Sequence, residues 1–278
     1  MNHSLSPIPP LSVILFASSV LAISPPEALC QSQPKEEVRD FRGLFEGMNG
    51  AFVLYDAAGN RFIRHNPEQC SRRLSPASTF KILNSLIGLE TGVIPDEHYI
   101  IPWDSVRRSV ADWNRSHDLE TAIRHSVVWY YQELARRVGT ERMNEFVQRA
   151  NYGNMDVSGP IDRFWLGSSL LISANEQIEF LKRLHDDALP FSKRSMGIVR
   201  RILVLEQTGE YVLRGKTGFS IDAANSGAGW FVGYLERGGQ IYYFATNIVS
   251  CRGASDTDRI MAARKPVTLA ILKELGLL

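Results

Sequence analysis

The chain has 278 residues, and its 31 Lys and Arg against 30 Asp and Glu leave a formal net charge of +1. A balanced charge without basic runs argues against nucleic acid as a partner, and 44% hydrophobic residues exclude a disordered chain. The length suits one large domain, or two lobes that share a core.

An apolar segment lies close to the N-terminus, at residues 11–23 (LSVILFASSVLAI). It is shorter than the roughly 20 residues that span a bilayer, and it is typical of the hydrophobic region of a signal peptide. We expect residues 1–30 to be an export signal, cleaved after residue 22 or 30, and residues 31–278 to be a periplasmic catalytic domain without a stable membrane span. Residues 1–10 contain no Lys or Arg, which leaves an uncleaved anchor or a wrong start codon as alternatives.

Apolar periodicity predicts strands at both ends of the mature chain and helices between them. Alternation at 51–56 and 61–65 predicts a hairpin. Helical spacing follows from Ser78 to Arg201, and is clearest at 120–138, 141–150 and 174–185. Three further strands are expected, at 211–216, 229–236 and 240–248, before a closing helix at 258–275. This order predicts one mixed sheet with a helical insertion.

The cysteines and histidines do not predict a metal site. None of the three cysteines forms a C-x-x-C motif, and the six histidines lack the spacing of zinc ligands. Cys70 and Cys251 could form a disulfide in an oxidising compartment, or each could be a small buried thiol.

Residues 74–92 (LSPASTFKILNSLIGLETG) carry the densest chemical pattern. Ser75 followed by Pro76 predicts a helix N-cap and a first-turn proline. Ser78 is then expected in the first turn, where free backbone N–H groups favour a developing oxyanion. Lys81 follows one turn later on the same side, so its amine could reach the Ser78 hydroxyl and take its proton. The alternative is a capping serine beside a solvated lysine.

Two more motifs extend this pattern. Ser126-Val127-Val128 falls within the helical insertion, and Lys216-Thr217-Gly218 ends a predicted strand. The set S-x-x-K, S-x-V and K-T-G, in this order, resembles the class D (oxacillinase) β-lactamases. Further matching segments are Tyr152-Gly153-Asn154, Phe164-Trp165-Leu166 and residues 229–233 (GWFVG).

The resemblance covers residues 40–278 and implies an α/β fold of the α+β type, that of serine β-lactamases and transpeptidases. Such a fold has a largely antiparallel sheet with terminal helices on one face and a mostly helical insertion. The active site is expected between the sheet and the insertion.

The resemblance also implies the roles of the acylation residues. Ser78 would be the acylated nucleophile, and its N–H with that of Phe219 would form the oxyanion hole. Lys81 would be N-carboxylated by carbon dioxide and act as general base, without a metal or a diffusible cofactor. The carbamate pocket would consist of Phe80, Val128, Trp165 and Leu166. Its apolar members would lower the lysine pKa by desolvation, and the Trp165 indole would supply a hydrogen-bond donor.

The remaining implied roles concern the substrate. Ser126 would pass a proton to the β-lactam nitrogen, with Lys216 holding the local field positive. Thr217, Gly218 and Arg264 would bind the substrate. Thr217 and Arg264 would contact its carboxylate, for which a planar guanidinium is well suited. Two other basic residues, Lys265 and Arg252, are alternatives to Arg264.

The implied reaction is hydrolysis of the amide bond of a β-lactam through an acyl-enzyme, which confers β-lactam resistance. A peptidoglycan transpeptidase or carboxypeptidase, and a β-lactam sensor that stays acylated, are the alternatives. The sequence leaves open which penicillins, cephalosporins or carbapenems are hydrolysed, and whether the chain is a monomer or a homodimer.

Overall fold

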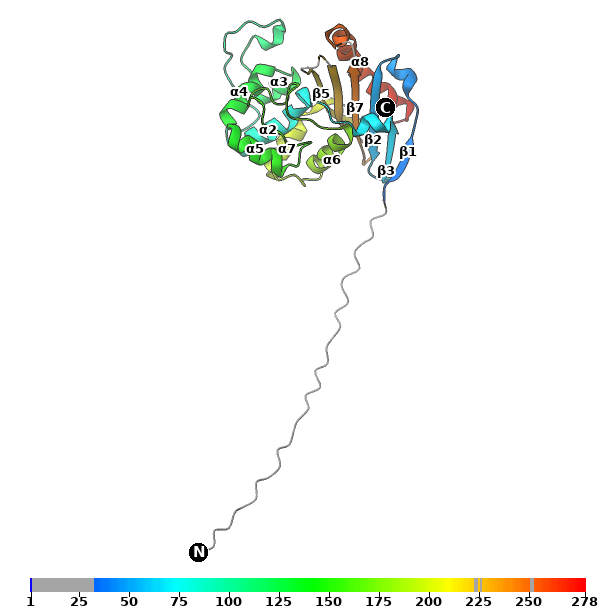
Figure 1. The fold of residues 1–278 in the computed structure, drawn as a ribbon, viewed down its shortest axis with the longest axis horizontal. Coiled ribbons are helices and arrows are strands. Elements are labelled where there is room, and N and C mark those ends of the chain that lie inside the picture. The colour runs from blue at the N-terminus through cyan, green and yellow to red at the C-terminus, as the bar shows by residue number, and fades with distance from the viewer. Residues whose placement is uncertain (2–32, 223–224, 226, 251–252) are drawn as a thin grey trace. The chain divides into compact units, whose positions relative to one another are not determined.

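A seven-stranded sheet forms the centre of residues 34–278 (Figure 1). The computed structural model describes residues 1, 33–222, 225, 227–250 and 253–278. Across the sheet the strands are ordered β1 (Lys35–Val38), β3 (Arg61–His65), β2 (Asn49–Asp56), β7 (Gln240–Ser250), β6 (Gly227–Arg237), β5 (Tyr211–Ile221) and β4 (Val204–Gln207). All neighbours pair antiparallel except β1 with β3. The predicted largely antiparallel sheet is therefore confirmed.

The helical insertion separates β3 from β4 along the chain. Its helices are α1 (Pro67–Ser71), α2 (Lys81–Glu90), α3 (Leu119–Arg124), α4 (Val128–Val138), α5 (Thr140–Arg149), α6 (Ala174–His185) and α7 (Lys193–Ile202). Two 3₁₀ turns also belong to it: η2 (Ala77–Phe80), directly before α2, and η3 (Ala111–Trp113). A further 3₁₀ turn, η1 (Arg42–Phe45), lies between β1 and β2. After β7, the 3₁₀ turn η4 (Gly253–Asp256) leads into α8 (Thr257–Glu274), which closes the fold.

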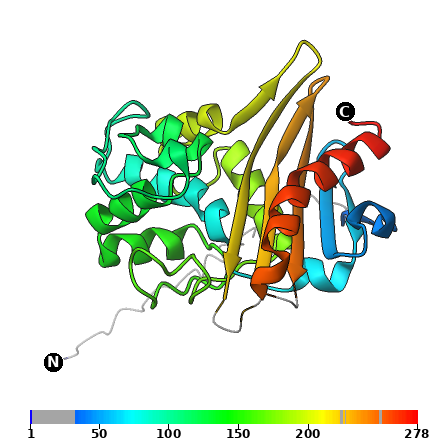
Figure 2. The same ribbon diagram turned by 90° about the horizontal axis from the view of Figure 1, so that it is seen from above.

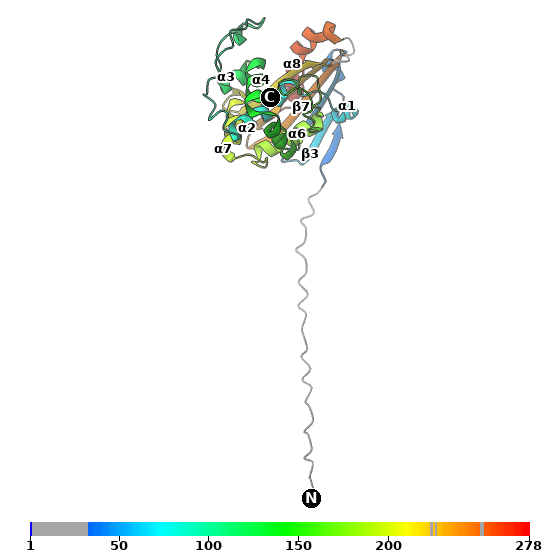
Figure 3. The same ribbon diagram turned by 60° about the vertical axis from the view of Figure 1, so that its left-hand side comes forward.

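The two faces of the sheet bury different cores, because alternate side chains of a strand point to opposite faces. On β6, Trp230 and Val232 pack with the residues of the insertion. Phe231 and Leu235 pack instead with residues of α8 such as Ile271. Figure 2 shows α8 lying along one face of the sheet, and Figures 1 and 3 show the insertion as a separate body of helices beside it.

Three local predictions around the motifs were wrong. Ser75 does not cap a helix, because its hydroxyl donates to the Trp165 carbonyl oxygen, and α2 begins only at Lys81. The predicted helix over 120–138 is broken into α3 and α4, and Ser126 lies at the break in a left-handed conformation (φ 53°). Lys216-Thr217-Gly218 does not end a strand, since β5 continues to Ile221.

The predicted export signal, residues 1–30, lies almost entirely outside the described residues. Among the helices that the structure describes, none is long and apolar enough to cross a membrane. Cys70 is a free, buried thiol, and burial raises its pKa to about 12. Cys251 lies outside the described residues.

Candidate active site

The nucleophile candidate Ser78 lies where the helical insertion meets the sheet. It is the second residue of η2 and is only 9% exposed. A Cβ atom added to Gly218 of β5 would lie 3.2 Å from the Ser78 backbone nitrogen and 2.9 Å from the Pro76 carbonyl oxygen. Only glycine at this position therefore lets the strand approach the turn so closely. The structure thus brings the Ser78 N–H and the K-T-G segment together.

Lys81 is the most deeply buried lysine of the site, with a residue exposure of 1%. Its Nζ lies 2.6 Å from the carbonyl oxygen of Ser126 and 2.9 Å from the hydroxyl oxygen of the same residue. Burial, and then the charge of Lys216, lower the pKa of the Lys81 amine well below its usual range. The amine is thus available in its neutral form, which has a lone pair and is nucleophilic.

Ser126 is held between two lysines. Its hydroxyl oxygen lies 2.9 Å from Lys81 Nζ and 3.0 Å from Lys216 Nζ. The left-handed backbone at Ser126 interrupts the helical path between α3 and α4, which are otherwise continuous in sequence pattern. The break presents both the carbonyl and the hydroxyl of one residue to the same amine. A proton can therefore pass between the Ser126 hydroxyl and either amine.

Lys216 and Arg264 place positive charge along β5. Burial, and then the charge of Arg264, lower the pKa of Lys216 to about 7. Arg264, in the second turn of α8, donates through Nη1 to the Gly218 carbonyl oxygen at 3.4 Å. Its Nε is buried and has no hydrogen-bond partner in the described part of the chain. Of the two alternatives to it, Lys265 is exposed and Arg252 lies outside the described residues. Arg264 is therefore the cation that the structure brings to the K-T-G segment.

The predicted carbamate pocket has a polar group without a partner. Trp165 is fully buried, and its indole Nε1 has no hydrogen-bond partner in the part of the chain that is described. Its ring stacks on Phe80, the residue before Lys81, with centroids 5.3 Å apart. Leu166 packs against the hydrophobic core that contains Phe80 and Trp165. Val128 is half-buried at the start of α4. A buried donor without an acceptor is costly, so it fits a site that receives an anionic group.

One expected contact is absent from the described hydrogen bonds. The i, i+3 spacing predicted that the Lys81 amine would reach the Ser78 hydroxyl, but the amine bonds to Ser126 instead. The two residues belong to different helical turns, since Ser78 lies in the 3₁₀ turn η2 and Lys81 begins α2.

The two other predicted site residues of β5 lie on either side of Gly218. Thr217 precedes it and Phe219 follows it, and both are half-buried.

The sequence analysis missed a residue that links the site to its surroundings. Ser75 Oγ donates to the Trp165 carbonyl oxygen at 2.9 Å and accepts from the Gly167 N–H at 2.8 Å. The Ser75 carbonyl accepts from the Trp230 indole N–H at 2.8 Å. Ser75 therefore holds the Trp165 backbone and β6 against the nucleophile turn. A serine before proline is also typical of a cap, so its sequence did not distinguish the two roles.

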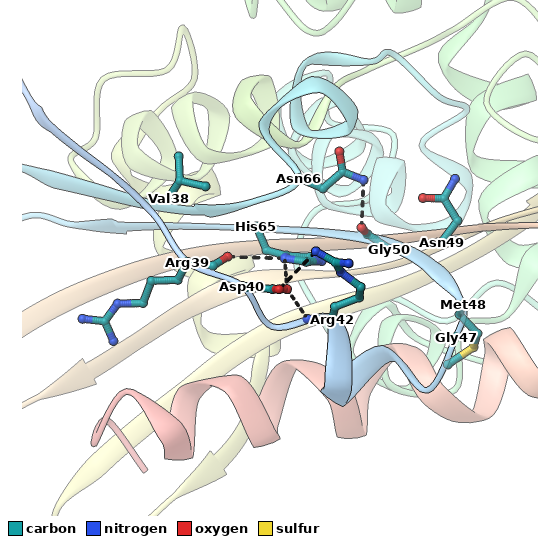
Figure 4. Close-up of a pocket in the computed structure, with 10 residues that line it drawn as sticks. All are labelled: Val38, Arg39, Asp40, Arg42, Gly47, Met48, Asn49, Gly50, His65 and Asn66. Atoms are coloured by element: carbon teal, nitrogen blue, oxygen red, sulfur yellow. Dashed lines mark hydrogen bonds and ion pairs between the residues drawn. The ribbon is translucent and has the colours of Figure 1, made fainter.

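A cavity of about 640 Å³ lies elsewhere, between β1, η1 and the start of α1 (Figure 4). It contains Arg42, Asp40, His65 and Asn66, but these groups largely pair with one another or with the local backbone. None of the candidate catalytic residues lines this cavity.

Comparison with known proteins identifies the family. Residues 50–273 match the family of the penicillin binding protein transpeptidase domain. The chain is 41% identical over 234 residues to a probable β-lactamase, YbxI of Bacillus subtilis, and the match covers 84% of each chain. A crystal structure of the class D β-lactamase YbXI from Nostoc is 46% identical, with a TM-score of 0.79, and the match covers 86% of this chain and 98% of that one. The regulatory protein BlaR1 of Bacillus licheniformis is 32% identical, over 87% of this chain and 39% of its own length.

Proposed function

This chain belongs to the class D serine β-lactamases, and we propose that it opens the β-lactam ring through an acyl-enzyme on Ser78. The placement of Ser126 Oγ between the amines of Lys81 and Lys216 supports this above all. It provides a path for the proton that must reach the β-lactam nitrogen when the ring opens. The neighbouring Ser78 N–H beside Gly218 supplies a donor for the carbonyl oxygen.

We propose the following sequence of bond changes. Ser78 Oγ attacks the β-lactam carbonyl carbon, and its proton passes to the base at Lys81. The backbone N–H groups of Ser78 and Phe219 donate to the oxyanion, the carbon–nitrogen bond breaks, and Ser126 gives its proton to the nitrogen. Ser126 then takes the proton held at Lys81, which frees the base. A water molecule gives a proton to this base as its oxygen attacks the ester, and the proton passes to the Ser78 oxygen as the opened product leaves.

We further propose that Lys81 is N-carboxylated. Its burial favours the neutral amine that reacts with carbon dioxide, and the unpartnered Trp165 N–H suits a carbamate oxygen. When bound, the carbon dioxide converts the lysine into an anionic general base. Phe80, Val128, Trp165 and Leu166 would hold this group.

Substrate binding is proposed to depend on the carboxylate next to the β-lactam nitrogen. Arg264 and Lys216 supply positive charge, and Thr217 a hydroxyl, along one strand segment. The Nε of the partly buried Arg264 guanidinium has no acceptor among the described residues, and a carboxylate oxygen can accept from it.

The test is hydrolysis of a chromogenic β-lactam, with and without added bicarbonate in buffer depleted of carbon dioxide. We expect turnover that rises with bicarbonate. A transpeptidase or a sensor of the BlaR1 kind would instead form an adduct that persists for hours with a good penicillin, and that result would replace the hydrolase. Turnover that ignores bicarbonate would overturn the carbamate alone.

A further inference from the structure

The turn that presents Ser78 has an unusual backbone. Ala77, directly before the nucleophile, has a φ of 49° and is completely buried. Alanine adopts this left-handed conformation only at an energetic cost, so the surrounding structure must hold it there. Such enforced conformations concentrate at functional sites.

Thr79 closes this turn from within η2. Its backbone N–H donates to the Pro76 carbonyl oxygen at 3.1 Å, and its hydroxyl donates to the same oxygen at 2.7 Å. Two hydrogen bonds therefore span Ala77. They fix the Pro76 carbonyl, which is also the backbone atom closest to a Cβ placed on Gly218.

Gln177 of α6 holds Thr79 from the other side. Its Nε2 donates to Thr79 Oγ1 at 2.9 Å, and both side chains are fully buried. Because the Thr79 hydroxyl proton is committed to Pro76, its oxygen can only accept, and this fixes the orientation of the Gln177 amide. The same nitrogen lies 3.4 Å from the hydroxyl of Tyr152.

The other end of this amide is unsatisfied. Gln177 Oε1 is buried without a hydrogen-bond partner among the described residues. A leucine of similar size would remove this unpaired acceptor, so the glutamine is not the side chain best suited to stability alone. Its remaining contribution is the position that it imposes on Thr79.

We propose that Gln177 is a positioning residue for the oxyanion hole, acting through Thr79 and the Pro76 carbonyl on the Ser78 N–H. The proposal rests on the proposed role of the Ser78 and Phe219 N–H groups. Loss of the amide relaxes the turn at Ala77 and shifts one donor relative to β5. Acylation slows for this reason, whereas ground-state binding through Arg264 does not change.

The experiment measures single-turnover acylation of the full folded domain by stopped flow. In Gln177→Leu we expect the acylation rate constant to fall about 10- to 100-fold, with little change in substrate dissociation constant. This is less than the roughly 100- to 1000-fold loss for a missing oxyanion donor, because the donor is displaced and not removed. Affinity for a phenylboronic acid that adds to Ser78 should fall in parallel. The bicarbonate concentration for half-maximal activity should stay at the wild-type value.

The matched control is Gln69→Leu. Gln69 is another buried glutamine, on α1, whose Nε2 donates to Asn247 Oδ1 at 2.9 Å. The Gln69→Leu variant loses the same side-chain amide, and we expect its acylation rate to equal that of wild type. Equal losses of acylation rate in both variants would overturn the proposal, because the effect would then follow from general destabilisation.

A second pair keeps the test decisive where Gln177→Leu does not fold. Thr79→Ser retains the hydroxyl and should acylate close to the wild-type rate, whereas Thr79→Val should show the same loss as Gln177→Leu. Fast acylation by a folded Thr79→Val variant overturns the proposal. A wild-type protein that forms no Ser78 adduct at all would reject the proposed function instead.

Discussion

The side-chain nitrogens of Lys81 and Lys216 share one partner, the Ser126 hydroxyl, at 2.9 and 3.0 Å. Two ammonium groups this close, both buried, repel each other and lack solvent to offset their charge. The charge of Lys216 therefore lowers the tendency of Lys81 to hold a proton, in addition to the effect of burial, and the charge of Arg264 acts on Lys216 in the same way. This arrangement favours a neutral amine at Lys81.

Lys216 should make the free energy of unfolding rise with pH. The pKa of Lys216 is about 7 in the folded protein, whereas that of a lysine in the unfolded chain is near 10.5. Between these values the unfolded state binds more protons, so stability rises with pH, by up to about 1.4 kcal/mol per pH unit. Lys216→Met should remove this contribution.

The measurement is urea unfolding between about pH 7 and 9 in bicarbonate-depleted buffer. Lys193→Met, at an exposed lysine in the first turn of α7, is the control and should keep the wild-type slope. If Lys216→Met also keeps that slope, Lys216 does not release its proton early in the folded protein.

Ser78→Ala should abolish covalent modification by a β-lactam. The variant lacks the attacking oxygen but keeps the backbone N–H that lies beside Gly218. Intact-mass spectrometry of wild type quenched with acid during turnover should show an increase equal to the mass of the β-lactam, and the variant should show none. Ser75→Ala is the matched control, since its hydroxyl bonds to backbone groups, and an adduct should still form. An adduct in Ser78→Ala would reject this nucleophile.

Lys81 should give a carbamate carbon resonance when the protein is incubated with ¹³C-bicarbonate. Burial, and then the charge of Lys216, lower the pKa of its amine, which favours the neutral form that reacts with carbon dioxide. The resonance should be missing in Lys81→Ala and present in Lys182→Ala, at a lysine paired with Glu179 on α6. A wild-type spectrum without it would remove the carbamate from the mechanism.

Trp165→Phe should separate the indole N–H from the ring that stacks on Phe80. Because the N–H is unpaired in the structure, its loss should cost little stability, but a buried carbamate would lose a donor. We expect carboxylation to weaken about tenfold or more, with slow deacylation, burst kinetics, and partial recovery in bicarbonate.

Trp230→Phe is the comparison for this variant. It removes an indole N–H that is bonded to the Ser75 carbonyl, so it should lower stability without raising the bicarbonate requirement. A Trp165→Phe variant with the wild-type bicarbonate requirement would exclude the indole as a carbamate donor.

We expect the predicted export signal to be cleaved from the protein. Expression of the full chain in a Gram-negative host should yield periplasmic protein that begins at residue 23 or 31, because the apolar segment at 11–23 is too short to span a bilayer. N-terminal sequencing of the periplasmic fraction is the measurement. Full-length protein retained in the membrane fraction would favour an uncleaved anchor.

Elements with a clear apolar periodicity could be predicted from the sequence. The hairpin of β2 and β3, the helix α6, and the three long C-terminal strands lie close to their expected positions. The edge strands β1 and β4 were missed because each has only four residues, too few to show alternation. Their pairing with β3 and β5 stabilises them, which a local pattern does not encode.

The motifs predicted which residues meet at the site, but not their backbone conformations. The apolar spacing continues through Ser126 and therefore predicts a helix there. In the structure Ser126 has a left-handed backbone conformation, and its hydroxyl contacts Lys81 and Lys216. Gln177 lies at a polar position of a correctly predicted helix, where nothing local distinguishes a solvated side chain from one that contacts Thr79.

The site combines residues as far apart in the sequence as Ser78 and Arg264. Some paired strands of the sheet are equally far apart in the sequence. Val53 of β2 pairs with Ala245 of β7, about 190 residues later, and such non-local pairing forms slowly. A chain that emerges N-terminal end first therefore presents its serine before β5, which carries the proposed oxyanion donor Phe219, and α8, which carries Arg264, exist. Labelling by a β-lactam then counts only molecules in which both ends have assembled, so the rate at which labelling appears during refolding reports completion of the whole domain.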